Sequence, residues 1–227
     1  MNTLEKDYVV SYLTLRQMIG WAGLLMPLVV RGGGLLFEDI ASNESISAYY
    51  YTDMRDIFVS TLVLVGALLA CYRTPQLRDN LASTAAGIAA IGIGLFPMNP
   101  SYAAELIAQH PHLTSADCYS IHGVLGYHFI FVATFFALSF YLVYFRFAAN
   151  TPVHPGRNKL MRNRIYKLCG LVMLLAFAAI GWIALVARGA SIFWPESGAV
   201  GAFAIAWLVK GQTVLKDTHS PQVAAPM

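Results

Sequence analysis

Long apolar runs are the feature that most restricts what this chain can fold into. Hydrophobic residues make up 57% of its 227 residues and charged residues only 12%, and the mean hydropathy is +0.57. A soluble domain carries about twice that fraction of charged residues. Runs of this length and polarity predict helices that cross a bilayer. We therefore expect an all-α, polytopic transmembrane bundle of six helices, at about 14–30, 56–73, 80–98, 119–145, 166–187 and 197–215.

The six runs are predicted to form a single domain over residues 1–216. Arg16 interrupts the first run, and glycines at 32–34 follow it where a signal peptide would carry a small-residue cleavage site. We interpret the run as a retained first helix that breaks at these glycines. The short tail, residues 217–227, contains proline and is expected to be disordered.

Basic residues orient the predicted bundle. With the N-terminus inside, twelve of the fifteen basic residues fall on the inner side, and only Arg31, Arg55 and Arg188 fall outside. This positive-inside pattern predicts that both termini are cytoplasmic, in a multi-pass protein of the cell membrane that we expect to be a bacterial inner membrane. Eight of the twelve acidic residues fall outside, where they either contact a cation or substrate or simply solvate the loops.

Asp53, Asp56 and Ser60 form the clearest polar pattern on the outer side. At about 100° per residue, the three side chains lie within about 60° of one another on one helix face. The pattern fits a site that descends from the surface into the membrane. It also fits helix capping, in which carboxylates complement free N–H groups at a helix N-terminus. The sequence leaves both interpretations open.

Four of the six histidines lie between residues 110 and 128. His122 and His128 enter the predicted fourth helix, where a histidine is costly enough to be a functional candidate. Six positions place these two side chains about 240° apart, so at most one can face the polar stripe, and we favour His122. A hydrogen bond between helices is the alternative role.

Three further groups of residues carry predictions: outer charged residues, a basic stretch and the small residues of the third run. Glu38, Arg55 and Glu196 lie on the outer side and are predicted to bind a ligand or to join the Asp/His cluster in a polar network. The basic stretch 157–167 is expected to meet anionic lipid headgroups and is not a nucleic-acid motif. Small residues recur every four positions in the third run and predict close helix packing there: Ala82, Ala86, Ala90 and Gly94.

The three cysteines are expected to remain unpaired thiols. Cys71 and Cys169 lie toward the inner ends of their predicted helices, and Cys118 lies in an outer loop.

Four segments together resemble a set of uncharacterised bacterial six-helix membrane proteins, similar in outline to the DRAM-like group and more remotely to the ceramidase-like CREST superfamily. They are residues 47–59, Gly-Leu-Phe-Pro at 94–97, His122 with His128, and Arg-Asn-Arg-Ile-Tyr-Lys at 162–167. The CREST resemblance implies a zinc ion held by histidines beside an Asp and a Ser. Asp56 and Ser60 would match that Asp and Ser, and His122 and His128 would supply one or two of the ligands. The chain lacks the closing H-x-x-x-H of that superfamily.

Two functions are consistent with these residues. The first is a non-catalytic membrane protein whose outer Asp/His cluster binds a membrane lipid, a small molecule or a partner protein, which could be a second copy of the chain. The alternative is a membrane-embedded metal-dependent hydrolase of lipid amides or esters. Its catalytic residues would be Asp53, Asp56, Ser60 and His122. Its metal ligands, with zinc as the candidate metal, would be Asp56, His122 and His128.

Overall fold

The computed structural model describes residues 3–38, 40, 45–99, 108, 127–149, 155–187 and 190–216. A 3₁₀ helix, η1 (Ser47–Tyr51), precedes α2, and a π-helix, η4 (Tyr141–Arg146), continues α5. Within the described residues the chain has no strand, which confirms the predicted all-α fold class, and it forms six α-helices: α1 (Thr3–Phe37), α2 (Arg55–Cys71), α3 (Leu77–Leu95), α5 (Tyr127–Phe140), α6 (Arg157–Leu185) and α7 (Phe193–Lys210).

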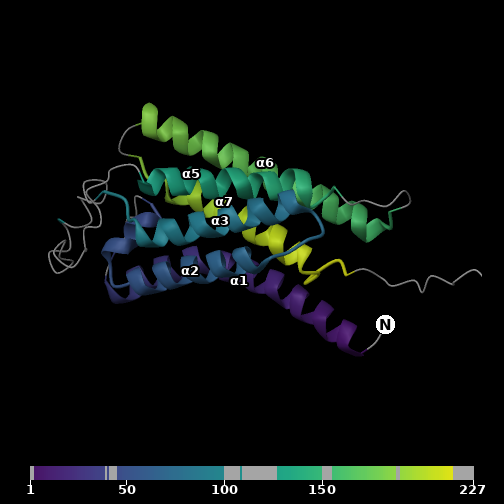
Figure 1. Ribbon diagram of the computed structural model, residues 1–227. Coiled ribbons are helices and arrows are strands. Elements are labelled where there is room, and N and C mark those ends of the chain that lie inside the picture. The colour runs from purple at the N-terminus through teal and green to yellow at the C-terminus, as the bar shows by residue number, and fades with distance from the viewer. Residues whose placement is uncertain are drawn as a thin grey trace, which may run out of the picture.

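The helices lie side by side in one bundle (Figure 1). α2 packs against α1 and α3, α3 packs against α5, and α7 packs against both α6 and α1. α5 and α6 touch more lightly. The helices therefore follow one another around the bundle in chain order, and the last closes against the first. Aromatic side chains fill much of the core, among them Tyr49, Phe58, Tyr166, Phe203 and Trp207.

Three stretches of described helix are long and apolar enough to cross a membrane: Ser11–Phe37, Tyr127–Arg146 and Arg157–Leu185. Large apolar side chains are exposed along the last of these, including Leu168 and Leu175. An apolar surface of this extent on a folded chain marks contact with a membrane or a partner.

The predicted break after the first run is wrong. α1 continues through the glycines at 32–34 to Phe37. A Cβ atom at Gly33 would collide with the sulfur of Met54, and one at Gly34 would lie 2.8 Å from Cε1 of Tyr49. These two glycines allow η1 and the start of α2 to approach the helix closely, so their role is packing and not a turn.

The small-residue ladder of α3 is buried, as predicted: Ala82, Ala86, Ala90 and Gly94. Its neighbour Gly87 meets Gly66 of α2, where a Cβ atom at Gly66 would lie 2.6 Å from the carbonyl oxygen of Gly87. The two backbones therefore touch directly, and Ser83 Oγ strengthens the contact by donating to Leu69 O at 2.7 Å.

Two predicted boundaries also shift. α6 begins at Arg157, about nine residues before the predicted span, because Lys and Arg are good helix formers and no proline follows Pro155 in this segment. α7 ends at Lys210, before the predicted limit of 215. Residues 119–126, the start of the predicted fourth helix, and the tail 217–227 lie outside the described residues.

Candidate functional site

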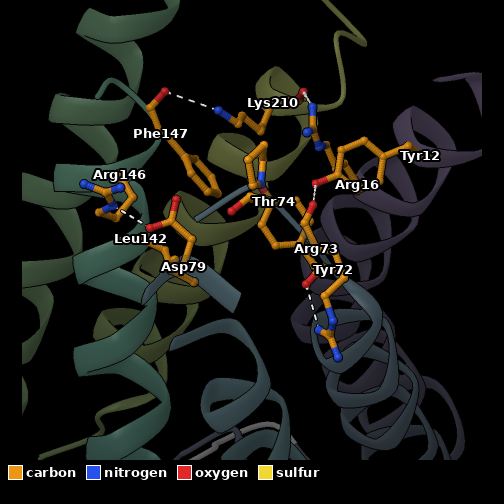
Figure 2. Close-up of a pocket in the computed structure, with 11 residues that line it drawn as sticks. Tyr12, Arg16, Tyr72, Arg73, Thr74, Asp79, Leu142, Arg146, Phe147 and Lys210 are labelled. Atoms are coloured by element: carbon orange, nitrogen blue, oxygen red, sulfur yellow. Dashed lines mark hydrogen bonds and ion pairs between the residues drawn. The ribbon is translucent and has the colours of Figure 1, made fainter. Parts of the chain in front are cut away.

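A cavity of about 160 Å³ lies at one end of the bundle. We call this the basic end, because Arg16, Arg146 and Lys210 meet there (Figure 2). The lining comes from α1, the turn between α2 and α3, α3 itself, η4 and α7. Three aromatic residues and five charged residues contribute to it: Tyr12, Tyr72 and Phe147, and Arg16, Arg73, Asp79, Arg146 and Lys210.

Arg16 reaches the cavity from α1. Its Nη1 donates to Lys210 O at 3.1 Å, a carbonyl at the C-terminal end of α7, where the helix dipole favours a cation. The guanidinium lies 4.1 Å from the centroid of the Tyr12 ring, and that ring stacks on Tyr72 with centroids 5.6 Å apart. The Nε–H of Arg16 is buried and has no hydrogen-bond partner among the described residues. A buried donor in this state costs about 1–3 kcal/mol, and an acceptor from outside would satisfy it.

Lys210 is the last residue of α7. Its Nζ donates to Phe147 O at 3.3 Å and lies 5.0 Å from the centroid of the Phe147 ring. In the described part of the chain, no carboxylate forms an ion pair with Lys210 or Arg16. Arg16 and Lys210 therefore contact carbonyl oxygens and aromatic ring faces, as basic groups commonly do.

Arg146 is the one lining cation with a carboxylate partner among the described residues. Its Nε donates to Asp79 Oδ1 at 2.5 Å, and Nη2 donates to Gln76 Oε1. The π-helical turn of η4 ends at Arg146 and adds a residue to that turn, which sets the direction of this side chain toward α3. Asp79 lies in the first turn of α3, where a carboxylate also complements the helix dipole.

Arg73 lies at the rim of the cavity, in the turn between α2 and α3. Its Nη1 donates to the carbonyl oxygens of Ala70 and Tyr72 and, at 3.3 Å, to Thr84 Oγ1 on α3. In Figure 2 its guanidinium points away from Arg16 and Lys210. Asn80 fixes the turn by accepting from Thr74 N and donating to Thr74 O.

The charge balance defines what the cavity can do. Four basic side chains and one carboxylate line it, so its basic groups outnumber its acidic group by three. Its polar lining offers several hydrogen-bond donors. The arrangement is suited to holding an anion.

Sequence reasoning missed this site. The five charged lining residues lie on α1, in the turn between α2 and α3, on α3, on η4 and on α7, and no local motif joins them. One signal was present, since Arg16 interrupts an apolar run and Lys210 lies within another, and a charge inside a membrane helix is a functional candidate.

The predicted polar stripe lies elsewhere, near the opposite end of the bundle, and it faces outward. Asp53, Asp56 and Ser60 are all exposed, and the Asp56 side chain keeps 93% of its surface open. Asp56 pairs with the adjacent Arg55 at 3.7 Å, and Ser60 Oγ donates to Ile57 O on its own helix. Exposed pairs of this kind contribute little to stability.

His128 lies away from that stripe. It is buried, with Nδ1 2.8 Å from Phe96 O and Nε2 3.1 Å from Ser47 Oγ. Because a carbonyl oxygen can only accept, Nδ1 carries the hydrogen and Nε2 accepts from the serine hydroxyl. Both ring nitrogens therefore join helices. The described residues include no group of three His, Cys, Asp or Glu side chains that could hold a metal, and His122 lies outside them.

Glu38 and Glu196 hold η1 in place. Glu38 Oε2 accepts from Asp53 N at 3.1 Å, and Glu196 Oε2 accepts from Ile46 N at 2.6 Å. Tyr49 of η1 is almost fully buried beside Glu38 and Arg31, and burial raises its pKa to about 12 although Arg31 acts in the opposite direction. The phenol is therefore neutral at physiological pH, and this end of the bundle is a hydrogen-bonded cap.

Comparison with known proteins gives no relative of this chain. No family model, no curated protein and no solved structure matches it. The grounds for a function are therefore the fold and the cavity at its basic end.

Proposed function

We propose that this chain is an integral membrane protein, of a bacterial inner membrane, that binds an anionic group in the cavity at its basic end. The observation that carries the proposal is the cavity lining, in which four cations face one carboxylate and the buried Nε–H of Arg16 has no partner among the described residues. The apolar helices support the membrane assignment. The gathering of basic residues at one end supports a cytoplasmic position for that end.

The energetic reason is the cost of holding charge away from water. A buried polar donor without a partner, or a cation without a counter-ion, is unfavourable, and an anion relieves both at once. Each charge-assisted hydrogen bond to such an anion contributes about 1.5–3 kcal/mol. At about 160 Å³ the cavity is smaller than the roughly 300–1,000 Å³ of sites for drug-sized molecules, so a compact phosphate, sulfate or carboxylate group fits it best.

Calorimetric titration of the purified protein in detergent tests the proposal. Sodium phosphate is titrated against a sodium chloride control of equal ionic strength. We expect saturable binding of phosphate, and we expect Lys210→Gln to weaken it about tenfold or more, because one charge-assisted contact is lost. The glutamine keeps a donor for Phe147 O, so the fold is retained.

The matched control is Arg164→Gln. Arg164 is exposed on α6 and does not line the cavity, so this variant removes the same unit of charge from the same end of the molecule. Equal binding by all three proteins, or no response to phosphate beyond that to chloride, would refute the proposal.

The functions predicted for the outer polar cluster stay predictions. Asp53, Asp56 and Ser60 are exposed, His128 hydrogen-bonds to Phe96 O and Ser47 Oγ, and the described residues include no metal-binding group of these side chains. The zinc-dependent hydrolase stays a prediction that depends on His122, which the structure does not describe.

A further inference from the structure

The guanidinium of Arg16 is held from two directions. Its Nη1 donates to Lys210 O at 3.1 Å, and its Cζ lies 4.1 Å from the centroid of the Tyr12 ring. The centroid of the Tyr72 ring lies 5.5 Å from the same Cζ atom. In Figure 2 the Arg16 side chain lies between the Tyr12 ring and Lys210. A planar group that packs on an aromatic ring and is hydrogen-bonded at one nitrogen keeps a fixed orientation.

The two tyrosines are themselves fixed by the fold. Their rings stack with an angle of 8° between the planes, and the Tyr12 hydroxyl donates to Arg73 O. Tyr72 is buried and meets the Trp207 ring edge-on, with centroids 4.9 Å apart. The stack thus joins α1 to the turn between α2 and α3 and to α7. It gives Arg16 a rigid surface to pack against.

This arrangement leaves one edge of the guanidinium for a ligand. Nη1 is engaged, whereas the buried Nε–H of Arg16 has no hydrogen-bond partner among the described residues. Nε and Nη2 lie on the same edge of the planar group, and one N–H bond of each points the same way. Two parallel donors match two oxygens of a carboxylate, phosphate or sulfate. A single atom such as a halide accepts both only at bent angles, which weakens each bond.

We infer that Arg16 is the specificity-determining residue of the anion site, which selects anions with two adjacent oxygens over single-atom anions of equal charge. This inference rests on the proposed function and names the feature of the ligand that the site recognises. Tyr12 is a positioning residue, because it acts on the ligand only through the orientation of Arg16. Lys210 carries a compact group of rotatable donors, so it adds affinity without distinguishing one anion shape from another.

Formate and bromide test this selection, because both are compact and carry one negative charge but only formate has two oxygens. Each is titrated as a competitor of phosphate, at constant ionic strength, by calorimetry of the full-length protein in detergent. We expect formate to displace phosphate at least about tenfold more effectively than bromide, a ratio that corresponds to about one charge-assisted hydrogen bond. Equal competition by the two anions would overturn the selection.

Arg16→Lys keeps the basic group and removes the pair of parallel donors. Phosphate should bind about tenfold more weakly to this variant, and its preference for formate over bromide should nearly disappear. The matched control is Arg164→Lys, the same exchange at an exposed position of α6 outside the cavity lining, which should keep both the affinity and the preference. An Arg16→Lys protein with the preference of the wild type would refute the role of Arg16.

Two substitutions of Tyr12 separate positioning from folding. Tyr12→Leu removes the ring on which Arg16 packs, so the preference for formate should fall about threefold or more although Arg16 is still present. Tyr12→Phe keeps the ring and loses only the hydrogen bond to Arg73 O, so it should keep the preference even where its melting temperature falls. The same loss of preference in both variants, or no loss in either, would contradict positioning by the ring.

The outcomes separate this inference from the proposed function. If phosphate binds and Lys210→Gln weakens its binding, but formate and bromide compete equally, the anion site stands and the selection by Arg16 is overturned. If phosphate does not bind the wild type beyond the chloride control, the anion site itself is overturned, and the inference with it.

Discussion

At the scale of single residues, Asp79 controls the charge of the cavity. Its side chain is only 11% exposed and it pairs with Arg146, so it cancels one of four positive charges. A carboxylate in that place opposes anion binding and yet holds η4 against α3. The same residue therefore acts on stability and on binding in opposite directions.

Asp79→Asn is expected to strengthen phosphate binding and to lower the stability of the fold. The lining loses one negative charge, so phosphate should bind about tenfold more tightly. Loss of this mostly buried pair should lower the free energy of unfolding by about 1–2 kcal/mol. Titration calorimetry gives the first quantity and denaturant unfolding in phosphate-free detergent gives the second. Weaker phosphate binding in this variant would contradict the electrostatic account of the site.

Residue identity alone could not predict the roles of the histidine and the acids near the opposite end. His128 was a predicted metal ligand. In the structure its Nδ1 hydrogen-bonds to Phe96 O and its Nε2 to Ser47 Oγ. Glu38 and Glu196 were predicted to bind a ligand or to join the Asp/His cluster, and in the structure they accept hydrogen bonds from the backbone N–H groups of Asp53 and Ile46. Those partners depend on how the chain turns between helices, which carries no periodic signal.

At the scale of elements, the contact between α2 and α3 brings two helix backbones together. Gly66 and Gly87 let the two backbones touch, and a Cβ atom on either would meet the carbonyl oxygen of the other. Backbone atoms cannot move aside as a flexible side chain can. Close packing of this kind replaces the hydrophobic drive that is missing between helices in lipid.

Gly87→Ala should therefore lower the free energy of unfolding by about 1–3 kcal/mol, which is the usual cost of overpacking a tight contact. The matched variant is Gly181→Ala in α6, where a Cβ atom would meet nothing within 4 Å. There alanine should be neutral or stabilise by up to about 1 kcal/mol through its higher helix propensity. Unfolding both variants by titration with a denaturing detergent checks the sign of each change.

Element existence could be predicted from the sequence, whereas element ends could not. Apolar run length reports directly on helices that a bilayer requires, and each predicted run corresponds to a helix in the described residues. The predicted break at 32–34 was wrong because glycine permits a turn and a close approach equally well. Only the positions of Met54 and Tyr49, distant in sequence, decide which of the two occurs.

At the scale of the whole molecule, the closed order of helices brings distant parts of the chain to the basic end. Arg16 and Lys210 are 194 positions apart and yet share a hydrogen bond. The sequence gives the helices but not which helix ends meet, so the cavity could not be predicted while the bundle could. The asymmetry of basic residues does predict which side of a membrane that end faces.

Cysteine labelling checks this orientation in intact cells. Cys71 is exposed near the basic end, and Cys118 is predicted to lie in an outer loop. In variants that keep one cysteine each, a membrane-impermeant maleimide added outside should label Cys118 and leave Cys71 unlabelled until the membrane is opened. The reverse pattern would place the cavity outside the cell.

The closing of α7 against α1 has a consequence for how the protein is made. Arg16 Nη1 donates to Lys210 O and Gln17 Nε2 donates to Gly211 O, so both side chains depend on the last helix of the described chain. At roughly 5–20 residues per second, a ribosome takes about 10 to 40 s to add the intervening segment. During that time the side chains of Arg16 and Gln17 lack these two hydrogen-bond acceptors. These two hydrogen-bonding groups of α1 therefore gain their partners only after α7 has been synthesised and has packed against α1.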